Sequence, residues 1–166
     1  MVLVRHGPAA PRDPQRWPDD ELRPLTREGR SLARAAARGL QRAGVQRPWI
    51  ASSPLARARA TAEIVAGVLD ADGSIETWPE LRPEGTGAAV LRRLASRRAR
   101  EGPRLLVGHE PNLGLLAGLL LSGEEVRPFR LAKSGAARLS LPRRIAPAAA
   151  SLDWLLTRKQ LVRLGE

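Results

Sequence analysis

The sequence contains no cysteine and no tyrosine, and it has a single phenylalanine. The missing cysteines exclude disulfides, thiolate catalysis and cysteine-based zinc sites, and they fit a reducing compartment. The few aromatic side chains leave no stacking platform for RNA bases. Histidine is scarce too, because His6 and His109 are the only two in 166 residues. Any histidine chemistry must therefore use these two side chains.

No apolar run is long enough to cross a membrane. The longest, at residues 113–121, falls far short of the roughly 20 residues that span a bilayer. The first residues also lack the charged start, the apolar stretch and the cleavage site of a signal peptide. We therefore expect a soluble, cytoplasmic protein that has no membrane partner.

The charge is strongly one-sided, with a formal net charge of +11. Such a surface attracts nucleic acid, phosphorylated ligands or acidic proteins. Lys133 and Lys159 are the only lysines, so 26 of the 28 cationic side chains are arginines, a bias that codon composition alone can produce. Without an aromatic platform we expect no nucleic-acid partner, and the sequence leaves the oligomeric state open.

Length and pattern predict one α/β domain over residues 1–166. Apolar residues make up 43% of the chain, which is enough for a sizeable core. Short apolar runs alternate with helical patterns, which favours three layers, with a mostly parallel central sheet between helices. The expected strands are 1–4, 49–52, 74–78, 104–108, 136–141 and 152–156. The expected helices are 26–43, 53–69, 88–100 and 111–121, with a loose basic helix in the last ten residues.

Helix ends can be predicted from single residues. Thr26 is placed to cap the first helix and Gly44 to end it. Ser53 is placed to cap the second helix, with Pro54 in its first turn. In the third helix Leu91, Leu94 and Ala95 are expected to face inward.

Two corners of the chain share a local design, since Arg5-His6-Gly7 and Gly108-His109-Glu110 each follow a buried strand. Ligands of open α/β sheets lie beyond the carboxyl ends of the strands. If the two strands are neighbours, both imidazoles face one cleft. A structural role for a pair of histidines so placed is the less favoured alternative.

A third segment, which starts at Ser53, also leads from a strand into a helix. The free N–H groups of that helix start suit an oxyanion, and Arg57 in the first turn can reach the cleft. Thr61 lies one turn further along the same face. We expect Gly7, Ser53 and Thr61 to contribute to substrate binding, and Lys133-Ser134-Gly135, before a late strand, is a further candidate contact of the phosphate.

These residue types match the chemistry of phosphoryl transfer. The transferred group spreads charge over three oxygens, which planar guanidinium groups bind in pairs. A neutral imidazole nitrogen can attack phosphorus and form a covalent intermediate that water then hydrolyses. If two arginines and a second histidine carry the charge, no metal and no cofactor is needed.

Four motifs, in order along residues 1–121, resemble those of one known family. They are Val4-Arg5-His6-Gly7, Leu25-Thr26-Arg27-Glu28-Gly29, the run from Ser53 to Ala62, and Val107-Gly108-His109-Glu110-Pro111. The chain resembles the histidine phosphatase superfamily, with its phosphoglycerate-mutase-like fold, and especially the small SixA-type phosphohistidine phosphatases. The resemblance implies that His6 is the phosphorylated nucleophile and that Arg5, Arg57 and His109 complete the phosphate pocket. It also implies a backbone carbonyl that orients the His6 ring.

The sequence departs from many relatives in having no long insertion that carries an acidic residue. Only 51 residues separate Arg57 from His109, which leaves no room for a lid domain. Glu80 and Glu84, between residues 79 and 87, are the candidate acids, and the alternative is that both are solvated loop carboxylates. No ligand set for a metal is present, since Asp13 and Glu110 lack the spacing to join the histidines.

The lack of a clear proton-donating acid in the sequence favours one substrate class. An alkoxide with a pKa of about 16 needs a proton donor when it leaves, whereas imidazole with a ring pKa of about 6.5 leaves far more readily. We therefore expect phosphohistidine on a protein, such as a signalling phosphotransfer domain, as the substrate. Two alternatives stay open: a general phosphomonoesterase that uses Glu80 or Glu84 on small molecules, and a non-catalytic basic binding module.

Overall fold

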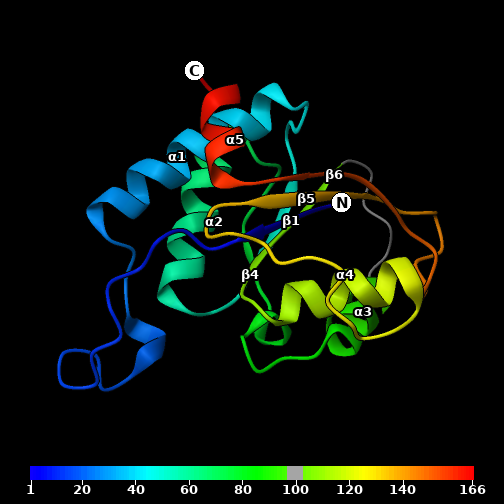
Figure 1. Cartoon of the computed structure of the whole chain (residues 1–166), viewed down its shortest axis with the longest axis horizontal. Coiled ribbons are helices and arrows are strands. Elements are labelled where there is room, and N and C mark those ends of the chain that lie inside the picture. The colour runs from blue at the N-terminus through cyan, green and yellow to red at the C-terminus, as the bar shows by residue number, and fades with distance from the viewer. Residues whose placement is uncertain (97–102) are drawn as a thin grey trace.

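The computed structural model describes residues 1–96 and 103–166 as six strands and five α-helices around one sheet (Figure 1). The strands are β1 (Val2–Arg5), β2 (Trp49–Ser52), β3 (Glu76–Thr77), β4 (Arg104–Gly108), β5 (Ala136–Ser140) and β6 (Ser151–Leu156). The helices are α1 (Arg27–Arg42), α2 (Ala56–Leu69), α3 (Gly87–Ser96), α4 (Asn112–Ser122) and α5 (Arg158–Leu164), with short 3₁₀ turns at Asp20–Leu22 and Pro79–Leu81. Among the described residues, no helix has both the length and the apolar character needed to cross a bilayer.

The sheet has the order β3-β2-β4-β1-β5-β6. The first four strands in this order are parallel, and β5 and β6 add an antiparallel edge. Helices α1, α2 and α5 cover one face and α3 and α4 the other (Figure 1). The predicted three-layer α/β fold with a mostly parallel sheet and no lid domain is therefore confirmed.

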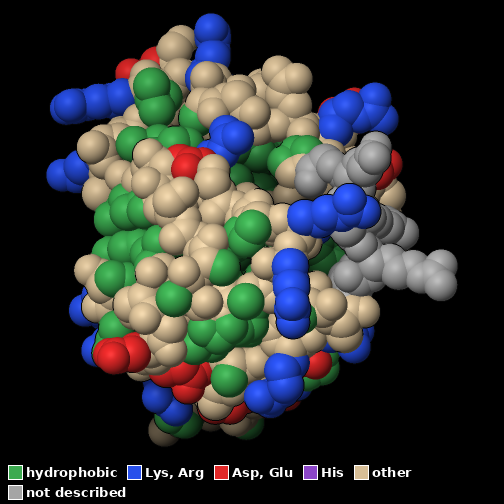
Figure 2. All heavy atoms as spheres, turned by 90° about the vertical axis from the view of Figure 1, so that its right-hand side faces the viewer, with side chains coloured by type: hydrophobic (Ala, Val, Ile, Leu, Met, Phe, Trp, Pro, Cys, Tyr) green, Lys and Arg blue, Asp and Glu red, His purple; other side chains and the backbone are tan. Residues whose placement is uncertain are grey.

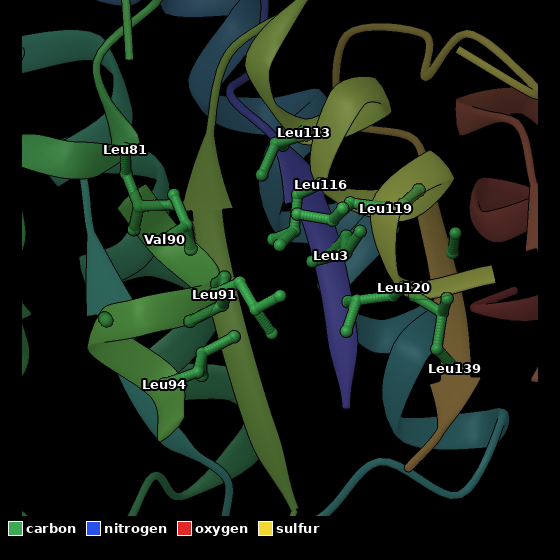
Figure 3. Close-up of a cluster of buried hydrophobic side chains, with 14 of the residues drawn as sticks. Leu3, Leu81, Val90, Leu91, Leu94, Leu113, Leu116, Leu119, Leu120 and Leu139 are labelled. Carbon is green, nitrogen blue, oxygen red and sulfur yellow. The ribbon is translucent and has the colours of Figure 1, made fainter. Parts of the chain in front are cut away.

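The central strands are buried on both faces, as expected of parallel strands between helices. Val2 and Val4 of β1 pack toward α1, α2 and α5, whereas Leu3 packs toward α3 and α4. Figure 3 shows leucines of α3 and α4 converging on Leu3. Because side chains alternate along a strand, this packing fixes the register of β1 in the sheet.

Register is what brings the two histidine corners together. Strand β1 runs parallel to β4, with Val4 opposite Val107 and Arg5 opposite Gly108. His6 and His109 are the next residues of their strands, so they leave the sheet side by side at its carboxyl edge. The opposite edge, which faces the viewer in Figure 2, shows apolar side chains between separate arginine and lysine side chains and no visible histidine.

The helix ends test the capping predictions. The Thr26 side chain accepts the Gly29 N–H at 2.8 Å, and Gly44 follows α1 with a φ of 80°, so both predictions are confirmed. The predicted start of the second helix is wrong, because α2 begins at Ala56 and Leu55 is its N-cap. Ser53 lies outside the helix, with its hydroxyl beside His109.

Two further predictions concern the third helix and the last ten residues. Helix α3 is described over Gly87–Ser96, and the rest of the predicted segment, to residue 100, lies outside the described residues. Ala95 is exposed rather than buried, and Val90 takes the inward position. The last ten residues do form a helix that packs on the fold: Leu161 of α5 is fully buried, and its backbone lies directly against Gly39 of α1.

Candidate active site

His6 and His109 form the centre of the site. Their ring centroids lie 4.8 Å apart with a tilt of 50° between the planes. Both rings are almost wholly shielded, since His6 is 6% and His109 2% exposed. The predicted convergence of the two strand ends therefore produces direct contact between the rings.

The His6 ring is held by the backbone of the next residue. Its Nδ1 lies 2.7 Å from the carbonyl oxygen of Gly7. Because a carbonyl only accepts hydrogen bonds, Nδ1 carries the proton, and this assignment leaves the lone pair on Nε2. The resemblance implied such a carbonyl, and Gly7 is the residue that supplies it.

Gly7 is itself anchored to α2. Its N–H donates to Thr61 Oγ1 at 3.0 Å, and the Thr61 hydroxyl donates to the carbonyl of Arg57 at 2.7 Å. Thr61 is 1% exposed, so both hydrogen bonds of its hydroxyl are shielded from water. The Gly7 N–H is occupied in this arrangement, and a direct contact of Gly7 or Thr61 with substrate stays a prediction.

Thr61→Val tests this link, because valine keeps the shape of threonine and removes its hydroxyl. We expect a loss of about 1–3 kcal/mol in the free energy of unfolding, since the buried Gly7 N–H is left without an acceptor. We also expect a fall in turnover of about tenfold, because the Gly7 carbonyl that orients His6 is released. Urea unfolding and steady-state assays measure both effects. Thr61→Ser, which keeps the hydroxyl, should behave like the wild type; equal behaviour of Thr61→Val would contradict the link.

Arg57 lies in the first turn of α2 and is 4% exposed. Its Nη1 donates to the carbonyl of Asp20 at 2.8 Å, and its Nη2 lies 3.0 Å from Asp20 Oδ2. The Arg57 Nε is buried and has no partner among the described residues. The side chain is thus held at its tip and keeps an unused donor, which an oxyanion would satisfy.

Arg5 is held from the opposite side of the site. Its Nη1 donates to the carbonyl of Leu131 at 2.9 Å, and its Nε is buried with no partner among the described residues. The N–H of the same Leu131 donates to Glu110 Oε1 at 2.9 Å, so Glu110 fixes the residue that positions Arg5. Burial raises the pKa of Glu110. The sequence suggested Glu110 only as a possible metal ligand. Its position directly after His109 was the one feature that could have indicated a role in the site.

Asp20 has no counterpart in the sequence-based predictions. It lies in the 3₁₀ turn Asp20–Leu22 and contacts both Arg57 and Arg23, whose Nε is 2.7 Å from Asp20 Oδ1. These two ion pairs hold the proline-rich segment before α1 against the site. The only signal in the sequence was the run of acidic residues at 19–21, which resembles any charged loop.

Ser53 contacts the second histidine, since its Oγ lies 3.0 Å from His109 Nε2. The Ser53 N–H donates to the carbonyl of Val107 at 2.9 Å, which continues the pairing of β2 with β4 by one residue. Ser53 is therefore part of the predicted site, where it touches His109 rather than capping α2.

Burial keeps both rings uncharged at neutral pH. Burial, together with the nearby guanidinium groups of Arg57 and Arg5, lowers the pKa of His6 to about 3 and that of His109 to about 2. The free site therefore offers a neutral imidazole as nucleophile, with three cationic or hydrogen-bonding groups around it.

The two rings can be titrated directly by ¹⁵N NMR, because no other histidine is present. We expect neither ring to titrate near pH 6.5, with His6 protonated on Nδ1 and unprotonated on Nε2. Below pH 6.5 the unfolded chain takes up protons that the folded chain does not, so stability falls as the pH drops toward 3. Addition of tungstate should raise both pKa values, since a bound anion favours the charged ring. A midpoint near 6.5 for either ring of the free protein would contradict its burial.

Neither candidate acid contacts the histidines or the site arginines among the described residues. Glu84 is exposed and lies 3.8 Å from Arg82, which also pairs with Glu21. The Oε2 of Glu80 is buried and has no partner among the described residues, and Glu80 lines a hollow of about 430 Å³ together with residues of α3. An acid role for Glu80 or Glu84 stays a prediction.

Within residues 1–96 and 103–166, no three His, Cys, Asp or Glu side chains are grouped so as to hold a metal ion. What the observed groups can do is bind a phosphoryl group through Arg5, Arg57 and His109 and present His6 Nε2 to its phosphorus atom.

Comparison with known proteins gives a consistent result. The sequence model of the histidine phosphatase superfamily (branch 1) matches residues 1–88. An uncharacterized protein of Picosynechococcus is 36% identical over 136 residues, which are 81% of each chain. Phosphohistidine phosphatase SixA of Escherichia coli K12 is 34% identical over 129 residues, 75% of each chain. A solved structure of the protein histidine phosphatase SixA complexed with tungstate superimposes with a TM-score of 0.82 at 29% identity, covering 97% of this chain and 99% of its own.

Proposed function

The chain belongs to the histidine phosphatase superfamily, and on that premise we propose that it hydrolyses phosphohistidine on a protein substrate, through a phosphohistidine intermediate on His6. The observation that carries the proposal is the 2.7 Å contact between His6 Nδ1 and the Gly7 carbonyl. That contact holds the proton on Nδ1, so Nε2 keeps the lone pair that attacks phosphorus. Burial supports the same role, because it keeps the ring neutral.

Transfer to His6 exchanges one phosphorus–nitrogen bond for another. The Nε2 lone pair of His6 attacks the phosphorus, and the bond from phosphorus to the substrate imidazole breaks. The substrate histidine leaves as a neutral imidazole when its other ring nitrogen carries a proton. Arg5 and Arg57 would bind the phosphoryl oxygens during the transfer, when negative charge is spread over them. They would contribute to catalysis by positioning the group and by stabilising this charge.

Hydrolysis of the intermediate returns the enzyme to its starting state. Water attacks the phosphorus, the bond to His6 Nε2 breaks, and the lone pair returns to Nε2. The proton lost by the water stays on the released phosphate. His109 lies next to His6 and would bind a proton once the phosphoryl dianion is in the site, because an anion nearby raises the pKa of an imidazole.

Two observations support a phosphohistidine substrate. First, no carboxylate of the described residues contacts either histidine, and an imidazole leaving group needs an acid far less than an alkoxide does. Second, a relative with 34% identity is named phosphohistidine phosphatase SixA. The tungstate complex of a SixA protein also supports an oxyanion site, because tungstate has the shape and charge of phosphate.

The test compares substrate classes without added metal and with a chelator. The purified protein is incubated with a histidine-phosphorylated phosphotransfer protein and, separately, with phosphosugars and nucleotides. We expect phosphate release from the phosphoprotein that the chelator does not affect. Hydrolysis of small esters alone, reduced in Glu80→Gln or Glu84→Gln, would instead support the general phosphomonoesterase. Salt-sensitive nucleic-acid binding without hydrolysis would support the basic binding module.

A further inference from the structure

A cationic hollow lies at the same edge of the sheet as the two histidines. It has a volume of about 440 Å³ and is lined by Ala132, Lys133, Thr157, Arg158 and Lys159. Strand β5 starts at this edge and β6 ends there, with Ala136 opposite Leu156. The hollow therefore lies between the segment before β5 and the start of α5.

Backbone hydrogen bonds tie this hollow to the catalytic strand. The Ser134 N–H donates to the carbonyls of Arg5 and His6, at 3.1 and 3.2 Å. The Gly135 carbonyl accepts the Arg5 N–H at 3.1 Å. Lys133 lines the hollow and directly precedes Ser134, whose N–H is bonded to the backbone of Arg5 and His6. The Cα atoms of two successive residues are roughly 3.8 Å apart, so the hollow starts one residue away from this backbone contact.

No carboxylate of the described residues pairs with the positive charges of the hollow. Lys133, Arg158 and Lys159 form no ion pair or hydrogen bond with any side chain of the described residues. Burial lowers the pKa of Lys133, and the charges of Arg5, Arg23, Arg57 and Arg158 lower it further.

The other side of the site is different. There Asp20 pairs with both Arg23 and Arg57, and Glu21 pairs with Arg82. Arg23, Arg57 and Arg82 are thus paired with the protein's own carboxylates. The three cations of the hollow have no such carboxylate among the described residues, and a bound substrate would supply the missing anion.

We propose that this hollow binds carboxylate side chains of the phosphorylated protein, close to its phosphohistidine. The inference rests on the proposed function and adds a recognition element to it. A phosphoryl group in the site brings its protein surface over the neighbouring hollow, and aspartate and glutamate are the anions that such a surface carries. Long-range attraction between the opposite charges would also speed encounter with an acidic protein.

The test uses two phosphohistidine peptides that differ only in glutamate or glutamine at the two positions on each side of the phosphohistidine. We expect the wild type to have a kcat/KM about tenfold higher for the glutamate peptide at low salt, with the preference shrinking as salt rises. Arg158→Gln/Lys159→Gln should lose the preference and keep the wild-type kcat/KM for the glutamine peptide. Arg143→Gln/Arg144→Gln removes an equal charge from the exposed segment between β5 and β6, at the opposite edge of the sheet (Figure 1), and should keep the preference.

The outcomes distinguish a failure of the carboxylate-site proposal from a failure of the proposed function. Equal hydrolysis of the two peptides by the wild type would overturn the carboxylate site and leave the phosphohistidine phosphatase intact. An unchanged preference in Arg158→Gln/Lys159→Gln, or an equal loss in the control, would also overturn it. Hydrolysis of p-nitrophenyl phosphate but of neither peptide would contradict the proposed function, and the carboxylate site would fall with it.

Discussion

Replacing His6 by alanine should abolish phosphate release from a phosphohistidine substrate, with kcat lower by at least about 10,000-fold. The reason is that, in the proposed mechanism, His6 Nε2 forms the covalent bond to phosphorus. Single-turnover assays with the phosphorylated protein measure the loss. Activity within tenfold of the wild type would remove His6 from the nucleophilic role.

A fold control belongs with this variant, because His6 is buried. The folded chain holds the ring uncharged, so its loss removes no ion pair, and His6→Ala should still unfold in one cooperative transition. His6→Gly offers a second control, since exogenous imidazole fits the space left by the ring. Partial recovery of phosphate release with imidazole would tie the defect to the missing ring.

Arg57→Ala should lower kcat by about 100- to 1,000-fold, the usual effect of removing one strong donor to a transition-state oxyanion. Arg57 is held by Asp20 through Nη1 and Nη2, and its buried Nε has no partner among the described residues. Arg57→Lys keeps the charge but loses the planar fork, so we expect it to recover only part of the activity. Steady-state kinetics on the same phosphoprotein measure both variants.

The matched control for Arg57 lies two residues further along α2. Arg59 is a half-exposed arginine that pairs with Glu63 at 3.1 Å, away from the site contacts. Arg59→Ala makes the same change in net charge in the same helical turn, and we expect wild-type kcat and KM. Equal losses in Arg57→Ala and Arg59→Ala would indicate a general effect of surface charge, and would contradict a specific contact of Arg57 with the phosphoryl group.

The corners that carry the histidines were predictable from the sequence, for a physical reason. Strands β1 and β4 are buried on both faces, so each appears as a short, almost purely apolar run that ends at a polar residue. Parallel strands also end at one edge of a sheet. The meeting of His6 and His109 needed only the further condition that these strands are neighbours, which the register of Arg5 with Gly108 satisfies.

The contacts that orient the arginines could not be predicted in this way. Asp20 reaches Arg57 from a loop 37 residues earlier, and Leu131 reaches Arg5 from 126 residues away. Loops have no periodicity from which a facing side chain can be assigned, and such contacts depend on where the loop crosses the sheet edge. Ser53 shows the same limit: its local sequence predicts a helix cap, but His109, 56 residues away, takes its hydroxyl.

The most direct test of the mechanism is to trap the phosphorylated enzyme. Wild-type protein is mixed with a phosphotransfer protein labelled on its phosphohistidine, and the reaction is quenched in alkaline denaturant within one turnover. We predict label on the enzyme that is stable to alkali and labile to acid, located by peptide mapping at His6 and absent from His6→Ala. Release of phosphate without labelled enzyme at any time, or label on another residue, would contradict a covalent intermediate on His6.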